Sequence, residues 1–285
     1  MAVLQRIVKG LEGLEVLDRL GSPLASASGR VTRPTPVKNA LSGTWLGHQL
    51  HPMLSDVPIG AWLAAGMLDL TGGAWGTRAA RRLVGLGVLA ALPTAAAGIS
   101  DWSETYGSEQ RVGLVHGLGN LAATGLQSAS YLARRRGRRG TAVTLSVGAL
   151  GIMTAAGYLG GHLSFNRGVG VNHTAFEEAV AEWTDVAALA ELASDKPVRV
   201  VAGGVPVVLV RQGGEQVYAL SATCVHAGGP LDEGEVVDGC LRCPWHASAF
   251  RLSDGKVMRG PAPIDQPAWE VRVEGERVQV RTAGH

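Results

Sequence analysis

Apolar residues gather in the first two thirds of the chain into four long stretches separated by short polar segments. These stretches cover about residues 57–75, 83–99, 112–133 and 141–165. Each is long enough to cross a hydrocarbon core roughly 30 Å thick, and none shows the charged face that a soluble helix of this length needs. The pattern predicts four transmembrane helices rich in glycine and alanine, which suit close helix packing. The alternative is a soluble helical bundle.

The last third has a different pattern, in which short apolar or alternating runs are separated by glycine-rich turns. The runs lie at residues 198–202, 206–210, 216–220, 269–273 and 277–281. Alternation over such short windows is typical of β-strands. The sequence therefore predicts a multi-domain protein, with an N-terminal all-α four-helix transmembrane bundle and a C-terminal all-β domain of antiparallel sheets in a barrel-like sandwich.

These patterns divide the chain into four segments. We expect an amphipathic N-terminal segment at residues 1–40, the four-helix transmembrane domain at 41–165, a linker at 166–185 and the β domain at 186–283. Residues 1–20 carry apolar side chains at helical spacing with both charge signs on the other face. This spacing predicts an amphipathic helix and not a cleavable signal peptide.

Charged residues are distributed unevenly among the loops of the helical part. Arginines crowd the first loop, at Arg78, Arg81 and Arg82, and the third, at residues 134–139, whereas acidic residues dominate the second. The positive-inside rule places the arginine-rich loops in the cytoplasm. Four crossings of the cell membrane then put both termini and the β domain on the extracytoplasmic face.

One acidic residue, Asp69, interrupts the first apolar stretch. It is either a residue at the helix end that reaches toward the membrane surface or a polar contact inside the bundle. The formal net charge is only +2 and comes largely from the arginine-rich loops, so the sequence gives no indication of nucleic-acid binding.

Two short motifs near the C-terminus each offer one thiolate and one imidazole. They are Cys224-Val225-His226 and Cys243-Pro244-Trp245-His246. A [2Fe–2S] cluster can take two cysteines on one iron and two histidines on the other, which raises its potential to roughly −150 to +300 mV. A zinc site uses the same residue types, but structural zinc more often shows paired C-x2-4-C or H-x3-5-H spacing. The spacing favours the cluster.

Residues 184–281 resemble the Rieske family along their whole length, most closely in CVHAGGPLDEGEV and LRCPWHASAFRLSDGKV. The resemblance implies that Cys224 and Cys243 bind one iron, and that His226 and His246 bind the other. Rieske oxygenases follow this domain with a long catalytic domain, and only about forty residues follow His246. We therefore expect an electron-transfer protein or an oxidoreductase subunit rather than a complete enzyme.

Four nearby positions bear on the reduction potential. In the Rieske proteins of cytochrome bc and b6f complexes, a serine and a tyrosine after the second motif donate hydrogen bonds to sulfur; here these positions hold Ser248 and Phe250. Those proteins also carry a disulfide between the two loops, at positions that here hold Gly229 and Trp245. The resemblance thus implies an intermediate or low potential, nearer to that of Rieske ferredoxins.

Histidines mark one face of the predicted membrane domain. His48 and His51 precede the first apolar stretch, His116 lies in the third, and His162 ends the fourth. Two imidazoles from neighbouring helices are the usual axial ligands of a b-type haem, so these residues are candidate haem or metal ligands. The alternative is interfacial histidines hydrogen-bonded to carbonyl or carboxylate groups.

The stretch from Trp45 to His162, with WLGHQLHPMLSDVPIG at its start, resembles an uncharacterised family of four-helix bacterial membrane proteins sometimes fused to Rieske domains. We expect a membrane-anchored Rieske protein that carries single electrons between a donor in the lipid bilayer, a quinol or a haem, and a redox partner protein. The alternatives are an electron-delivering component of a multi-chain oxidoreductase or oxygenase, and a membrane-tethered redox sensor.

Overall fold

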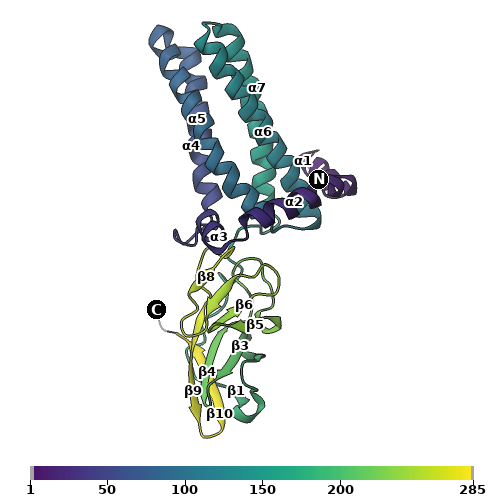
Figure 1. The fold of residues 1–285 in the computed structure, drawn as a ribbon, viewed down its shortest axis with the longest axis vertical. Coiled ribbons are helices and arrows are strands. Elements are labelled where there is room, and N and C mark those ends of the chain that lie inside the picture. The colour runs from purple at the N-terminus through teal and green to yellow at the C-terminus, as the bar shows by residue number, and fades with distance from the viewer. Residues whose placement is uncertain (1–2, 284–285) are drawn as a thin grey trace. The chain divides into compact units, whose positions relative to one another are not determined.

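The structure is a computed structural model that describes residues 3–283, with helices in the N-terminal part and strands in the C-terminal part (Figure 1). It divides into two compact units. The helical unit comprises the residues up to 34 together with residues 49–169, and the β unit comprises residues 35–48 together with those from 170 onward.

The part of the chain that the structure describes forms seven α-helices. They are α1 (Val3–Glu12), α2 (Asp18–Thr32), α3 (Thr35–Ser42), α4 (Leu50–Thr71), α5 (Gly73–Trp102), α6 (Gly107–Arg135) and α7 (Arg139–Phe165). The prediction of four helices is therefore wrong in its count. The additional helices, α1 to α3, precede the first predicted span. Helix α1 ends before Gly13, and α2 and α3 are separate because Pro34 has no backbone N–H with which to continue the hydrogen bonds of α2.

Three of the helices, α4, α5 and α7, are long and apolar enough to cross a membrane by length and composition. The third predicted span, residues 112–133, lies in α6, which is not among them. The reason is visible in the side chains of α6: Gln127, Ser130 and Arg134 are buried, whereas Leu118 and Leu121 are exposed. Polar residues in the interior of the unit lower the mean hydropathy of this helix.

Other helices of the unit also expose leucines and bury polar side chains. Leu70, Leu89 and Leu121 are 85%, 67% and 68% exposed, whereas Ser100 and Gln127 are fully buried. A soluble bundle buries its leucines and exposes its polar side chains. Apolar surfaces around a polar interior are what helices surrounded by lipid require, since lipid offers no partner for a polar group.

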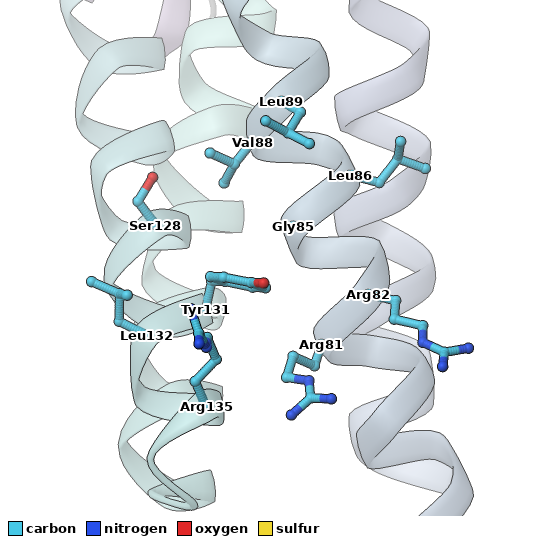
Figure 2. Close-up of a pocket in the computed structure, with 10 residues that line it drawn as sticks. All are labelled: Arg81, Arg82, Gly85, Leu86, Val88, Leu89, Ser128, Tyr131, Leu132 and Arg135. Carbon is cyan, nitrogen blue, oxygen red and sulfur yellow. The ribbon is translucent and has the colours of Figure 1, made fainter.

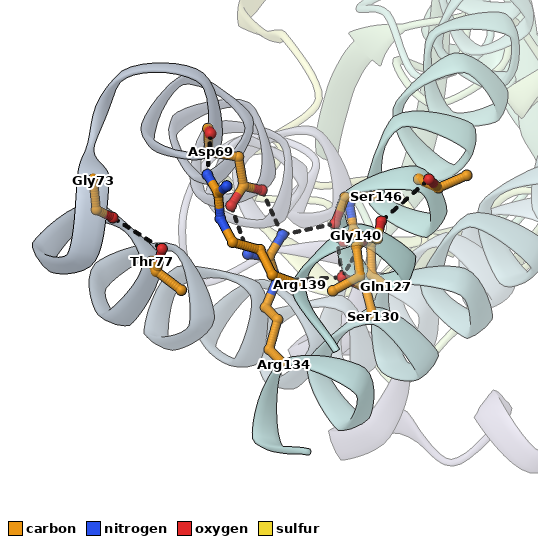
Figure 3. Close-up of polar contacts among 11 residues, drawn as sticks. Asp69, Gly73, Thr77, Gln127, Ser130, Arg134, Arg139, Gly140 and Ser146 are labelled. Carbon is orange, nitrogen blue, oxygen red and sulfur yellow. Dashed lines mark hydrogen bonds and ion pairs between the residues drawn. The ribbon is translucent and has the colours of Figure 1, made fainter. Parts of the chain in front are cut away.

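A buried ion pair joins α4 and α6 near the arginine-rich end of the helical unit (Figure 3). The guanidinium of Arg134 donates to both carboxylate oxygens of Asp69 at 2.7 and 2.5 Å, and the two side chains are 1% and 2% exposed. Ser130 and Ser146 accept further hydrogen bonds from Arg134, and Arg139 donates to the Asp69 carbonyl. Asp69 is therefore a polar contact inside the bundle.

The β unit contains two antiparallel sheets. Their strands are β1 (Thr184–Ala188), β2 (Pro197–Ala202), β3 (Val205–Gln212), β4 (Gln216–Ser221), β5 (Glu235–Val237), β6 (Cys240–Arg242), β7 (Ala249–Arg251), β8 (Val257–Arg259), β9 (Ala268–Glu274) and β10 (Arg277–Thr282). The larger sheet has the order β1-β10-β9-β4-β3-β2 and the smaller β5-β6-β7-β8. The predicted antiparallel, barrel-like all-β fold is confirmed.

The core of the β unit lies on both faces of β3. Val208 and Val210 pack in one hydrophobic cluster, and Val207 and Leu209 in another, because successive residues of a strand point to opposite faces. A strand covered on both faces reads as apolar throughout, which explains the run at residues 206–210. Cys224 and Cys243 belong to the first cluster, so the loops that carry them are anchored in the core.

Breaking the ion pair should destabilise the helical unit. Removal of one partner leaves the other charge buried without compensation, which costs about 3–5 kcal/mol. We expect Asp69→Asn to lower the free energy of unfolding by about this amount, measured by denaturant titration in detergent micelles. Asp56→Asn, at an exposed position of the same helix, should change it by less than about 0.5 kcal/mol. Equal losses in the two variants would contradict the assignment.

Candidate metal centre

The two motifs lie on loops attached to different sheets: the first follows β4, and the second connects β6 to β7. In each loop the cysteine N–H donates to the carbonyl five residues ahead, and the cysteine carbonyl accepts from the amide four residues ahead. The distances are 2.8 and 2.9 Å for Cys224 with Gly229 and Gly228, and 2.9 and 3.1 Å for Cys243 with Ser248 and Ala247. The two loops therefore repeat one turn.

Small residues are required at two points of these turns. The fourth residue after each cysteine is left-handed, Gly228 at φ +75° and Ala247 at φ +58°. Glycine adopts this conformation freely, whereas alanine is strained there. A Cβ on Gly229 would lie 2.9 Å from the Cys243 sulfur, so glycine leaves the space that the second loop needs.

The two cysteine side chains meet in the interior, with Cys224 1% and Cys243 3% exposed. A hydrogen bond from the Cys224 thiol to the Cys243 sulfur raises the pKa of Cys224 and lowers that of Cys243. Backbone N–H groups also donate to each sulfur, those of His226 and Ala227 to Cys224 and those of Trp245 and His246 to Cys243. Amides directed at sulfur stabilise the thiolate, which is the form that binds metals.

The two imidazoles form a second pair. The ring centroids of His226 and His246 are 4.9 Å apart, and the ring planes are 86° apart. Burial lowers the pKa of His226 to about 3, with further contributions from the charges of His246, Lys38 and His173. His226 Nδ1 is buried and has no hydrogen-bond partner within residues 3–283. A neutral imidazole with a buried, unsatisfied nitrogen is suited to bind a metal.

The arrangement of donors distinguishes between the two metal sites considered above. Structural zinc is held by one tetrahedral set of four ligands, whereas the donors here lie as two separate pairs. One thiol pair and one imidazole pair are instead what the two irons of a Rieske cluster use. The residues present therefore fit a [2Fe–2S] cluster.

The residues after the second motif are buried beneath it. Ser248 Oγ accepts a hydrogen bond of 3.0 Å from Ala262 N–H, which leaves the serine O–H hydrogen to donate elsewhere. Phe250 is fully buried opposite Leu241 and offers no hydroxyl. Cys240, at the start of β6, is half-buried. None of the three cysteines, Cys224, Cys240 and Cys243, forms a disulfide within residues 3–283.

Two further residues near the site come from segments outside the predicted β domain. Lys38, in α3, is 1% exposed and close enough for its charge to lower the pKa of His226, whose burial is the larger cause. Asn39 holds this helix in place, because its side chain donates to the Met258 carbonyl at 3.1 Å and accepts from Gly260 N–H at 2.8 Å. No local pattern in the sequence distinguishes Lys38 from other lysines.

The second of these residues is His173, which lies in the predicted linker. Its N–H donates to the Val225 carbonyl at 3.1 Å, and a Cβ on Gly228 would lie 3.5 Å from its ring. The linker therefore packs on the first ligand loop.

Of the four histidines predicted in or beside the membrane helices, the structure brings His51 and His116 together, with ring centroids 6.3 Å apart. Their Nδ1 atoms hydrogen-bond to backbone carbonyls of neighbouring helices, those of Thr94 at 2.9 Å and Ala156 at 2.8 Å. Gly98 and Gly160 make room for the rings, since a Cβ there would lie 2.7 and 3.0 Å from them.

The other two histidines have different surroundings. His162 Nε2 contacts the carboxylate of Glu12 at 3.0 Å, and His48 is exposed in the segment that belongs to the β unit.

The second ring nitrogen of His116 also has a partner, because its Nε2 atom accepts a hydrogen bond of 3.2 Å from Asn120. The expected carbonyl and carboxylate contacts thus describe His51, His116 and His162.

Comparison with known families gives matches to two parts of the chain. Residues 182–270 match the Rieske [2Fe-2S] domain, and residues 47–173 match the family described as predicted membrane protein (DUF2231). Both resemblances drawn from the sequence are therefore confirmed, and the two domains occur together in this chain.

Individual relatives match the C-terminal part. The anthranilate 1,2-dioxygenase ferredoxin subunit of Burkholderia cepacia is 34% identical over 106 residues, which cover 36% of this chain and 95% of the relative. The biphenyl 2,3-dioxygenase ferredoxin component of Rhodococcus jostii (strain RHA1) is 31% identical over 101 residues, 35% of this chain and 94% of the relative. Among solved structures, the ferredoxin of carbazole 1,9a-dioxygenase from Nocardioides aromaticivorans IC177 is 30% identical, with 36% of this chain and all of that chain covered and a TM-score of 0.35.

Replacing either histidine of the imidazole pair tests the ligand assignment. We expect His226→Ala and His246→Ala each to abolish the Rieske electron paramagnetic resonance signal of the reduced protein, because each removes one of two ligands to the same iron. His173→Ala, which removes a neighbouring imidazole without touching the proposed ligand set, should retain the signal. A signal that survives both ligand substitutions would sink the assignment.

Lys38 provides a test of the electrostatics around the site. Reduction adds a negative charge, so a buried cation near His226 favours the reduced form. We expect Lys38→Met to lower the midpoint potential by about 20–60 mV, where 59 mV is tenfold in the one-electron equilibrium constant. An electron paramagnetic resonance redox titration measures this shift. Lys256→Met removes the same charge at an exposed position and should leave the potential within about 10 mV, so equal shifts would contradict a local effect of Lys38.

Proposed function

The chain belongs to the Rieske [2Fe–2S] family through residues 182–270, and on this basis we propose that it is a membrane-anchored carrier of single electrons. The observation that carries the proposal is the donor set, two buried thiols and two imidazoles on loops that repeat one turn. When bound, a Rieske cluster exchanges one electron at a time. The Burkholderia and Rhodococcus relatives are ferredoxin components, which is the class of electron carrier that the proposal assigns.

Three observations support the membrane anchor. Residues 47–173 match a family of predicted membrane proteins, α4, α5 and α7 are apolar enough to span a membrane, and the helical unit exposes leucines around a polar interior. The first helix adds to this pattern, since Val3, Leu4 and Ile7 are exposed while Val8 is buried. A short helix with an exposed apolar face suits the membrane interface.

Connectivity supports an orientation for this anchor. The helices α4 to α7 follow one another through short turns, so residues 49 and 169 lie at one end of the unit and the arginine-rich turns at the other. We assign the arginine-rich turns to the cytoplasm by the positive-inside rule. The chain then leaves the helical unit toward the β unit on the extracytoplasmic side.

The donor is proposed to be a quinol or a haem within the membrane. His51 and His116 are the candidate haem or metal ligands, because the bond from each Nδ1 to a carbonyl fixes the ring and leaves Nε2 as the ligand atom. Asn120 would have to release His116 Nε2 for such a bond to form. His162 and His48 are weaker candidates, given the contact of His162 with Glu12 and the exposure of His48.

A second function is favoured by the relatives. The two ferredoxin subunits named above match nearly their full length to the β unit, which favours delivery of electrons to a separate catalytic chain of an oxidoreductase or oxygenase. A tethered redox sensor is the third alternative. The electron-delivering component passes its electron to the catalytic chain. The sensor carries no net flow of electrons.

One experiment tests the proposed function directly. The full chain is purified in detergent, iron and haem are quantified, and a dithionite-reduced minus oxidised visible spectrum is recorded before and after addition of a quinol analogue. We expect two irons per chain, the broad bleaching of a Rieske cluster and reduction by the quinol or through a haem. Sharp haem bands lost in His51→Ala would identify the haem donor. One zinc per chain, or a cluster that no quinol or haem reduces, would overturn the proposal.

A further inference from the structure

A groove of about 950 Å³ runs between α5 and α6 near the arginine-rich end of the helical unit (Figure 2). Its volume is on the scale of ligand sites, which enclose roughly 300–1,000 Å³. One end is basic and the rest largely apolar. The lining residues are Arg81, Arg82, Gly85, Leu86, Val88, Leu89, Ser128, Tyr131, Leu132 and Arg135.

The shape of the groove follows from one close contact. A Cβ on Gly85 would lie 2.9 Å from the ring of Tyr131, so glycine lets this ring pack directly against the backbone of α5. Figure 2 shows Tyr131 between the two helices, with Arg81 and Arg135 on one side of it and Val88 and Leu89 on the other. Arg82 points away from the centre of the groove.

The arginines of this groove have no acidic partner among the residues that the structure describes. The lining contains no acidic residue, and across residues 3–283 no ion pair or side-chain hydrogen bond engages Arg81, Arg82 or Arg135. Neighbouring arginines differ in this respect, since Arg134 is paired with Asp69 and Arg139 donates to the Asp69 carbonyl. Asp69 is therefore already engaged by Arg134 and Arg139.

We propose that this groove binds an anionic phospholipid, with Arg81 and Arg135 on the headgroup phosphate and an acyl chain along the apolar residues. A guanidinium presents paired N–H donors that match phosphate oxygens. Leu89 lies eight residues beyond Arg81, or about 12 Å along the helix, which gives the chain an apolar path away from the headgroup. Basic pockets between membrane helices on the cytoplasmic side are typical sites for anionic lipids.

A soluble phosphate compound has the same headgroup chemistry, and the apolar part of the groove decides between them. Leu86, Leu89 and Leu132 are 51%, 67% and 48% exposed, so a ligand without acyl chains would leave this surface uncovered. The lipid site rests on the membrane anchor of the proposed function. Fractionation of cells tests the anchor separately, because an unanchored chain would appear in the soluble fraction.

The test uses the full chain, delipidated in a non-ionic detergent, with native mass spectrometry to measure binding of phosphatidylglycerol and phosphatidylcholine. We expect phosphatidylglycerol to bind preferentially, and R81Q/R135Q to weaken its binding about twenty-fivefold, or about fivefold for each arginine. The matched control R136Q/R138Q removes the same charge from exposed positions outside the groove and should change the affinity less than twofold.

Three results would overturn the proposal: equal binding of the two lipids, equal losses in the two double variants, or complete displacement of phosphatidylglycerol by millimolar inorganic phosphate. The last result would assign a free phosphate site. The Rieske electron paramagnetic resonance signal and the helical circular dichroism of each variant check folding, and Arg81→Lys with Arg135→Lys should restore part of the preference, because charge without the paired donors is retained.

Discussion

The contact between two cysteine sulfurs inside the core of the β unit is the constraint on which the rest of the site depends. Both thiols belong to a hydrophobic cluster built on β3, so the positions of the loops are fixed by packing before any metal is considered. Four backbone amides directed at the sulfurs then compensate for charge that this apolar setting would otherwise disfavour. Gly228 allows the left-handed backbone of the first turn, and Gly229 allows the second loop to approach closely.

A second balance of polarity governs the helical unit. Its interior holds the Asp69–Arg134 pair with Ser130, Ser146 and Gln127, while leucines face outward. In water such an arrangement would be costly on both counts, because it buries charge and exposes apolar surface. In lipid both features become favourable, and the polar cluster then fixes the register of α4, α6 and α7 as leucine packing alone could not.

Sequence patterns drew attention to residues that the β unit brings together, but missed some details of the fold. The structure places Cys224 beside Cys243 and His226 beside His246, and the long strands of the larger sheet carried clear apolar runs. The strands β5 to β8 have only three residues each, which is too few to show an alternation of apolar and polar residues in the sequence. Mean hydropathy likewise does not mark α6 as a membrane-spanning helix, because its polar residues face inward. The position of Lys38 depends on Asn39 bonds to residues more than two hundred positions away, and no local pattern encodes such a contact.

The crossing of the chain between units at residues 34, 48 and 169 has a consequence for the order in which the protein forms. Asn39 is synthesised 219 residues before Met258, whose carbonyl it binds. During translation residues 35–48 have nothing to pack against until the β unit has been made, and contacts of such long sequence separation form late. The surroundings of His226 are therefore completed last, when an early segment is captured by the finished β unit. A β unit expressed on its own from residue 170 would lack this segment, and the two domains are less interchangeable than their separate families imply.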